Sequence, residues 1–202
     1  MNWLAVSQRV EICASSSERR DALDQRWHVF FEKCGLIPLL IPNKPEWMGH
    51  YLEQGQIKGI LLTGGNDLQS CGGSTPERDE TEKILINFSL QKRIPLLGVC
   101  RGMQMIQDFF GLPLYPVEGH VAEKQIIWAN KNKREVNSYH NFGTNQNLPV
   151  FDIWAQADDG IIKAIHHRDH LISGIMWHPE RMSPTPEIEL TFFKDFFGAC
   201  IE

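Results

Sequence analysis

Short apolar runs alternate with amphipathic segments along the first half of the chain. The apolar runs are bounded by polar residues, glycine or proline, which is typical of buried strands, and the segments between them space their apolar residues as helices do. We expect strands at residues 4–6, 36–41, 57–63 and 95–99, and helices at residues 18–35, 45–54, 77–92 and from 101 onward. Because strands that alternate with helices pair in parallel, this half predicts an α/β sheet.

The pattern changes beyond Gly111. Short segments rich in β-forming residues follow one another, separated by polar or glycine-containing turns, and no long helix is expected before residues 186–199. These segments are residues 125–129, 134–138, 150–156, 161–166 and 171–177. Such a series is typical of antiparallel strands, and we expect them to extend the edge of the parallel sheet within a single domain of residues 1–202.

Composition and charge exclude several classes of function. The chain has 42% hydrophobic and 22% charged residues and a formal net charge of -5, and its basic clusters, at residues 19–20 and 131–134, are short. A mildly acidic protein has no electrostatic reason to bind nucleic acid or an anionic membrane. No segment approaches the ~20 apolar residues that span a bilayer, and the start lacks the pattern of a secretory signal. We therefore expect a cytoplasmic protein that binds neither nucleic acid nor membrane.

The five cysteines are widely spaced and include no CxxC pair. An odd number without paired spacing argues against a disulfide framework and against a zinc site, and it fits a reducing compartment. His166, His167 and His170 are close in sequence, but no cysteine or carboxylate accompanies them at the usual ligand spacing. The sequence predicts no metal and no cofactor.

Cys100 stands at a predicted junction between a strand and a helix. The apolar run 95–99 leads directly into it, and residues 101–104 open the next helix. Gly98 and Gly102 leave room for a sharp turn and for a substrate. The free N–H groups and the dipole of a helix N-terminus favour the thiolate, which is the reactive form of cysteine. A buried structural cysteine is the alternative, but the setting favours a nucleophile.

A candidate base and its partner lie near the carboxy terminus. His178 follows a strand-like run, and Glu180 lies two residues further on. If this segment is extended, the two side chains point to the same side, so Glu180 can hold one ring nitrogen while the other faces Cys100. The alternative is a surface histidine beside a surface glutamate.

The third strand ends in the glycine turn, residues 63–67, which reads TGGND. Its glycines expose backbone N–H groups at the carboxyl end of a strand, where ligands bind in open α/β sheets, although a plain surface turn is the alternative. Residues 77–82 are interpreted as a charged helix start with a role in the site left open. His140 is either a substrate contact or a loop residue.

These motifs together resemble the class I glutamine amidotransferases, in particular the stand-alone γ-glutamyl hydrolases of the γ-glutamyl-γ-aminobutyrate hydrolase family. The resemblance rests on GVCRGMQ at residues 98–104, WHPE at 177–180 and GGND at 64–67, and it extends to residues 7–9, 78–82 and 136–138. It implies a flavodoxin-like α/β fold with a mostly parallel central sheet flanked by helices, and with antiparallel strands added in the carboxy-terminal half.

The resemblance also implies a role for each matching residue. Cys100 is the nucleophile, His178 the base and Glu180 the orienting acid, and the N–H groups of Gly65 and Arg101 form the oxyanion hole. The implied substrate-binding residues are Gln104, Ser138, Tyr139, His140, Asn141 and Phe142. Relatives tend to have two adjacent histidines and a glutamine where this chain reads YHNF at 139–142, so the resemblance does not carry over a leaving-group preference.

The leading hypothesis is a stand-alone cysteine hydrolase. It would cleave the γ-glutamyl amide bond of a small metabolite, either a γ-glutamyl amine or a γ-glutamyl nucleotide amidate, through a thioester, and release glutamate. A homo-oligomer is compatible with this hypothesis. One alternative is a glutaminase subunit that delivers ammonia to a separate synthetase. Another is an α/β protein that keeps the cysteine as a redox sensor or binding site without hydrolysis.

Overall fold

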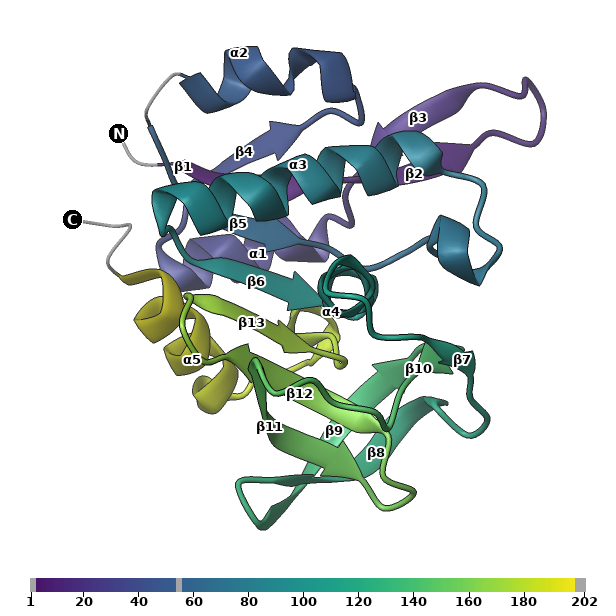
Figure 1. Ribbon diagram of the computed structural model, residues 1–202, viewed down its shortest axis with the longest axis vertical. Helices are drawn as coiled ribbons and strands as arrows, with labels where there is room; N and C mark the ends of the chain where they lie inside the picture. Colours follow the sequence, from purple (N-terminus) through teal and green to yellow (C-terminus); the bar gives the residue numbers. More distant parts are fainter. Residues whose placement is uncertain (1–2, 54–55, 199–202) are drawn as a thin grey trace.

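The alternating first half of the chain builds the parallel part of a nine-stranded sheet. The computed structural model describes residues 3–53 and 56–198. Five strands lie side by side in the order β4-β1-β5-β6-β13, all parallel (Figure 1). They are β1 (Trp3–Ser7), β4 (Pro38–Ile41), β5 (Ile57–Leu62), β6 (Leu96–Val99) and β13 (Ile172–Ile175). The predicted mostly parallel α/β sheet is confirmed.

Helices cover both faces of this sheet. On one face α1 (Arg26–Cys34) and α5 (Glu187–Phe197) pack on β1 and β6, with the rings of Phe30 and Phe193 4.7 Å apart. On the other face lie α2 (Met48–Glu53), α3 (Pro76–Lys92) and α4 (Arg101–Phe109). Figure 1 shows α3 in front of the strands and α1 behind them. Because both faces are covered, the central strands are continuous apolar runs.

Four antiparallel strands continue the sheet beyond β13. In sheet order they are β12 (Ile162–His167), β11 (Phe151–Ala157), β8 (Val121–Ala129) and β9 (Asn132–Tyr139). Residues 171–177 were expected to belong to this antiparallel series, and this holds for only one of the two neighbours of β13. The short turn after β12 reverses the chain, so β13 is antiparallel to β12 but parallel to β6.

The helix expected over residues 18–35 begins only at Arg26. Before it, β2 (Arg9–Ile12) and β3 (Arg19–Ala22) form a two-stranded antiparallel hairpin, which stands out from the sheet in Figure 1. The physical reason is that the buried helical stripe starts at Trp27, whereas the polar residues 18–21 are exposed and gain backbone hydrogen bonds by pairing with β2. The hairpin lies at the carboxyl end of β1.

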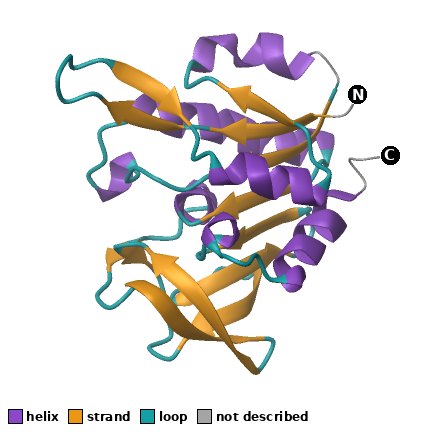
Figure 2. Cartoon of the chain, turned by 180° about the vertical axis from the view of Figure 1, so that it is seen from behind, coloured by secondary structure: helices purple, strands orange, loops and turns teal. Residues whose placement is uncertain are grey.

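Short elements complete the chain. The two-residue strands β7 (Tyr115–Pro116) and β10 (Phe142–Gly143) pair with each other. Single 3₁₀ turns are η1 (Pro45–Trp47), η2 (Gln69–Cys71) and η3 (Pro179–Arg181). Seen from behind, the helices group around the parallel strands while the antiparallel strands project below them (Figure 2). None of the described helices is long and apolar enough to cross a membrane.

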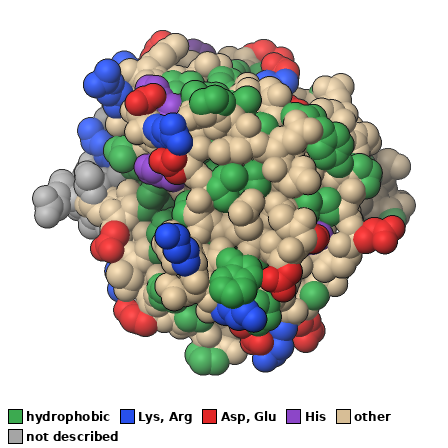
Figure 3. All heavy atoms as spheres, turned by 60° about the horizontal axis from the view of Figure 1, so that its bottom comes forward, with side chains coloured by type: hydrophobic (Ala, Val, Ile, Leu, Met, Phe, Trp, Pro, Cys, Tyr) green, Lys and Arg blue, Asp and Glu red, His purple; other side chains and the backbone are tan. Residues whose placement is uncertain are grey.

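The surface over the antiparallel strands carries mixed charges. In Figure 3, acidic and basic side chains are interspersed with apolar ones rather than gathered into a patch of one sign. The exposed apolar side chains of β8 are Val121, Ile126 and Trp128.

Cys13, Cys34, Cys71 and Cys100 are free thiols, and Cys200 lies outside the described residues.

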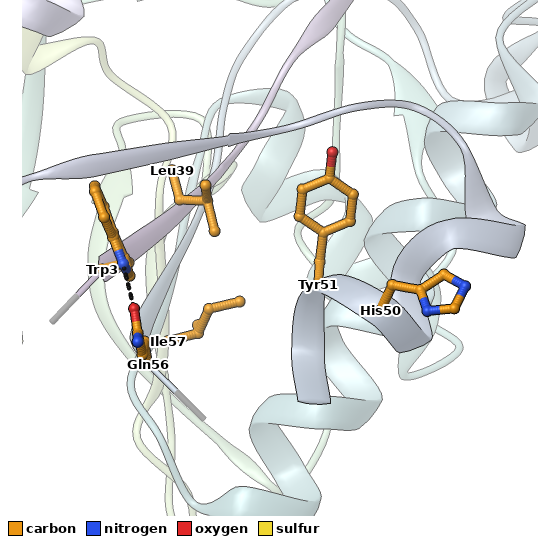
Figure 4. A pocket seen from close by; sticks show the side chains of 6 residues that line it. All are labelled: Trp3, Leu39, His50, Tyr51, Gln56 and Ile57. Carbon is orange, nitrogen blue, oxygen red and sulfur yellow. Dashed lines mark hydrogen bonds between the residues drawn. The ribbon is translucent and has the colours of Figure 1, made fainter. Parts of the chain in front are cut away.

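A pocket of about 360 Å³ opens beside α2 at the amino ends of β1 and β5 (Figure 4). Trp3, the first residue of β1, donates a hydrogen bond from its indole Nε1 to Gln56 across 2.9 Å. Leu39, Tyr51 and Ile57 contribute mostly apolar surface. The pocket lies at the opposite end of the parallel strands from Cys100, so it is separate from the candidate site described below.

Candidate active site

Cys100 occupies a strained turn between β6 and α4. Its φ is 54° and its ψ is -107°, a conformation that side-chain-bearing residues rarely adopt. A Cβ on Gly98 would overlap the backbone of Gly102, and a Cβ on Gly102 would overlap the carbonyl of Leu62. The two glycines therefore allow α4 to start directly over the strand ends, and the sharp turn expected at the cysteine is confirmed.

His178 and Glu180 form a buried pair just after β13. The Nδ1 atom of His178 lies 2.7 Å from Glu180 Oε1, and both residues are buried. The extended conformation expected for this segment is wrong, because residues 179–181 form the 3₁₀ turn η3. The contact is nevertheless made, since the turn brings the carboxylate back toward the ring.

Asn137 on β9 fixes the backbone of His178. Its side-chain amide donates to the carbonyl of His178 across 2.8 Å, and its Oδ1 accepts the N–H of His178 across 2.7 Å. The Asn137 side chain thus satisfies both the N–H and the carbonyl of His178, as a neighbouring strand would, and it anchors the candidate base to the antiparallel part of the sheet. Sequence reasoning assigned Asn137 no role, since its partner lies 41 residues away.

Cys100 and His178 meet beside Gly64. A Cβ placed on Gly64 would lie 2.6 Å from Cε1 of the His178 ring and 3.6 Å from Cβ of Cys100. Burial by itself lowers the pKa of His178, but the negative charges of Cys100 and Glu180 and hydrogen bonds to both raise it to about 9. His178 therefore carries a proton at neutral pH.

Replacing Gly64 by alanine is expected to lower activity by about 100-fold, because the added methyl group displaces the His178 ring from Cys100. Gly64 does not have a positive φ, so the fold and the thermal midpoint should change little. Gly49→Ala is the matched control, since a Cβ at Gly49 meets nothing within 4 Å. Initial rates and thermal unfolding of both variants check this, and full activity of Gly64→Ala would contradict the placement of the ring.

The glycine turn is held from behind by Arg78 on α3. The guanidinium, fully buried, donates to the carbonyls of Thr63 and Gly64, at 2.7 and 3.1 Å, and to that of Gly65. In a trans peptide the C=O and the following N–H point in opposite directions. Because the Gly64 carbonyl points to Arg78, the Gly65 N–H points away from Arg78.

A buried network of charges connects this turn to the start of α4. Arg78 pairs with Glu82 across 3.0 Å, and the side chain of Arg101 pairs with Glu82 and Asp79. The two guanidinium and two carboxylate groups balance, which allows their burial. The interpretation of residues 77–82 as a charged helix start is incomplete: Arg78 and Glu82 are inside the protein, and they join the glycine turn to the residue after Cys100. Arg101 is the first residue of α4, so its N–H has no acceptor within the helix.

A pocket of about 230 Å³ lies at this junction. It is lined by Gly65, Asn66, Asp67, Cys100, Arg101, Gln104, Tyr139, His140 and Asn141. The structure thus gathers residues from separate segments of the chain around the cysteine. The predicted site residues Ser138 and Phe142 do not line it: Ser138 is buried behind the wall, and the Phe142 carbonyl accepts a hydrogen bond from Gln104 Nε2 across 2.8 Å.

Comparison with known proteins identifies the family. Residues 33–199 match the family described as Glutamine amidotransferase class-I. The chain belongs to the class I glutamine amidotransferase family. Among solved structures, a glutamine amidotransferase from Thermotoga maritima aligns with a TM-score of 0.65 at 19% identity, covering 98% of this chain and 84% of that one. At this identity the likeness shows the class I glutamine amidotransferase fold alone.

Two curated relatives carry names of hydrolases. The chain is 32% identical over 205 residues to a gamma-glutamyl-CDP-amidate hydrolase of Campylobacter jejuni, covering 99% of this chain and 100% of the relative. It is 27% identical over 209 residues to a gamma-glutamyl-gamma-aminobutyrate hydrolase of Escherichia coli O157:H7, covering 83% and 82% of the two chains. Both names describe the relatives, which are hydrolases of γ-glutamyl compounds.

Proposed function

We propose that the protein is a stand-alone cysteine hydrolase that cleaves the γ-glutamyl amide bond of a small γ-glutamyl metabolite and releases glutamate. The observation that carries the proposal is the pocket lined by Cys100, Gly65 and Arg101, together with the ring of His178, which is paired with Glu180 and packs beside Cys100 at Gly64. This arrangement contains a nucleophile, a proton carrier with its orienting acid, and two donors for a developing negative charge.

Acylation uses the proton that His178 already holds. The Cys100 thiolate attacks the γ-carbonyl carbon, a C–S bond forms, and the carbonyl oxygen becomes an oxyanion that accepts hydrogen bonds from the N–H groups of Gly65 and Arg101. Each such donor contributes about 3 kcal/mol in a preorganised site. The tetrahedral intermediate then expels the amine: the C–N bond breaks, and His178 gives its proton to the departing nitrogen.

Deacylation reverses these roles. A water molecule attacks the thioester carbon while neutral His178 accepts a proton from it. The second tetrahedral intermediate breaks the C–S bond, Cys100 leaves as a thiolate, and glutamate is released. Glu180 stabilises the imidazolium that exists at the start and end of the cycle.

Two cavities near Cys100 are available for the two parts of the substrate. Gln104 and residues 139–141 line the pocket beside the cysteine, where they hold the glutamyl group. Tyr139 also lines a second cavity of about 540 Å³, whose charged lining residues are Arg26, Glu123, Lys124, Glu135 and Arg181. A cavity of this size, which shares Tyr139 with the cysteine pocket, accommodates a leaving group larger than ammonia, and this favours an amine or a nucleotide amidate over glutamine.

The test is release of glutamate by the purified protein from a panel of γ-glutamyl compounds that share the acyl group and differ in the amine. The panel contains γ-glutamyl amines, a γ-glutamyl nucleotide amidate and glutamine. We expect hydrolysis of at least one non-glutamine substrate with no partner protein present. Inactivity across the panel, with glutamine hydrolysis appearing only after a synthetase is added, would instead support the alternative in which the protein delivers ammonia to that synthetase.

A further inference from the structure

A buried lysine lies behind the wall of the active-site pocket. Lys163 on β12 is 1% exposed, and its Nζ lies 2.6 Å from Nε2 of His140 and 3.1 Å from Oγ of Ser138. A lysine is rarely buried without a specific partner, because its ammonium loses the hydration that water provides. No step of the proposed acyl transfer uses Lys163, so its burial requires another explanation.

The hydrogen bonds around Lys163 fix the protons of its neighbours. An ammonium group only donates, so Nε2 of His140 must accept. The Nδ1 atom of His140 therefore carries the ring proton and donates it to the Phe142 carbonyl, 2.8 Å away. Gln104 Nε2 donates to that same carbonyl across 2.8 Å. A continuous path thus runs from Lys163 through His140 and the Phe142 carbonyl to Gln104, in the wall that faces Cys100.

The other polar groups near Lys163 also fit a pattern in which Lys163 donates its hydrogen bonds. Ser138 Oγ accepts from Lys163 and donates to the carbonyl of His120 across 2.7 Å. The ring of His120 stacks on that of His140 with centroids 4.9 Å apart, and its Nε2 lies 2.8 Å from Asp159 Oδ2. Gln125 Nε2 lies 3.0 Å from Nδ1 of His120 and occupies its other nitrogen. Each polar atom of Lys163, Ser138 and His140 thus has a defined donor or acceptor role.

Burial and the charges of neighbouring groups together set the pH range in which Lys163 is protonated. Burial lowers the pKa of Lys163 to about 7, against the raising effect of Asp159, in the turn after β11, and of Cys100. Burial, and then the charge of Lys163, lower the pKa of His140 to about 3, with His120 and His178 adding to the effect. His140 is therefore neutral throughout the working range of pH, whereas the charge of Lys163 changes near neutrality.

We propose that Lys163 is a positioning residue for the glutamyl pocket, which holds His140 in its Nδ1–H form and thereby fixes the Phe142 carbonyl and the side chain of Gln104. The proposal rests on the proposed function in assigning this wall to the glutamyl group. Its geometric part, the tautomer of His140, does not depend on the reaction.

The kinetic test replaces Lys163 by methionine, which is similar in length and removes both the donor and the charge. We expect KM for the γ-glutamyl substrate to rise about 10-fold while kcat changes less than about threefold, since the wall is loosened but the triad is untouched. In the wild type KM should rise as pH increases through about 7, because a neutral amine can also accept a hydrogen bond and no longer forces Nε2 of His140 to be the acceptor. The variant should have a high KM at every pH. Lys92→Met, at an exposed site, is the matched control.

The structural test records the tautomer of His140 in the free protein by two-bond ¹H–¹⁵N NMR. Below about pH 7, where Lys163 is an ammonium, the Nδ1–H form is expected in the wild type, with loss of this preference in Lys163→Met. An Nε2–H form in the wild type, or an unchanged tautomer and KM in the variant, would overturn the proposal. If Lys163→Met does not fold, Lys163→Gln and the wild-type spectrum decide. If the wild type hydrolyses no γ-glutamyl amide, the proposed function fails while the spectra still judge the positioning role.

Discussion

Replacing Cys100 by alanine is expected to lower kcat for γ-glutamyl amide hydrolysis by about 10⁴- to 10⁶-fold, since the nucleophile of an acyl-transfer enzyme acts as a unit with its base. Alanine keeps the Cβ of the strained turn, so the backbone at φ 54° is neither relieved nor strained further, and the thermal midpoint should change little. Glutamate release measures the loss. Intact mass spectrometry during turnover should detect a glutamyl adduct on the wild type and none on Cys100→Ala.

Chemical labelling of the nucleophile requires a background variant. Cys13, in the turn between β2 and β3, is partly exposed, and hydrogen bonds from Ser15 and Ser16 lower its pKa to about 7. An alkylating reagent will therefore modify Cys13 as well as Cys100. Alkylation of Cys100 should therefore be measured in the Cys13→Ala variant, which lacks the competing thiol. Cys71→Ala is the matched control. Activity of Cys100→Ala above about one per cent of wild type would contradict its assignment as the nucleophile.

The parts of the fold and site that follow from the sequence depend on short-range signals. Short apolar runs located β1, β4, β5 and β6, because strands that are covered on both faces are mostly apolar, whereas β13 was placed in the antiparallel series. The turn at Cys100 was predictable for a similar reason: Gly98 and Gly102 lie within two residues of the cysteine whose conformation they allow. In these cases the cause and the effect lie within a few residues of each other.

The parts that could not be predicted depend on partners far apart in the chain. The β2–β3 hairpin is built from polar residues, whose pattern favours neither a strand nor a helix. Asn137 acts on His178 across 41 residues, and Lys163 acts on His140 across 23. In sequence, Lys163 is one polar residue in a short strand, and only the packing of β12 against residues 138–140 reveals that its ammonium is buried.

Replacing Glu180 by glutamine is expected to lower kcat by about 10³- to 10⁴-fold with the fold retained. The carboxylate accepts the Nδ1 proton of His178 across 2.7 Å, and a neutral amide no longer stabilises the imidazolium. The measurement is kcat for glutamate release, together with thermal unfolding. Glu187→Gln, at the exposed start of α5, is the matched control and should retain full activity. Near-normal kcat in Glu180→Gln would contradict the triad.

The pH profile of the same variant separates this role from a purely structural one. In the proposed mechanism acylation needs protonated His178, so on the alkaline side kcat/KM should fall as pH rises through about 9. The charge of Glu180 is one of the causes that raise this pKa. Removing it lowers the pKa, so in Glu180→Gln the alkaline fall of the residual activity must begin at a lower pH than in the wild type. A substitution that only loosened the fold would reduce activity without changing the pH at which the alkaline fall begins, because the charge beside the imidazolium would be unchanged.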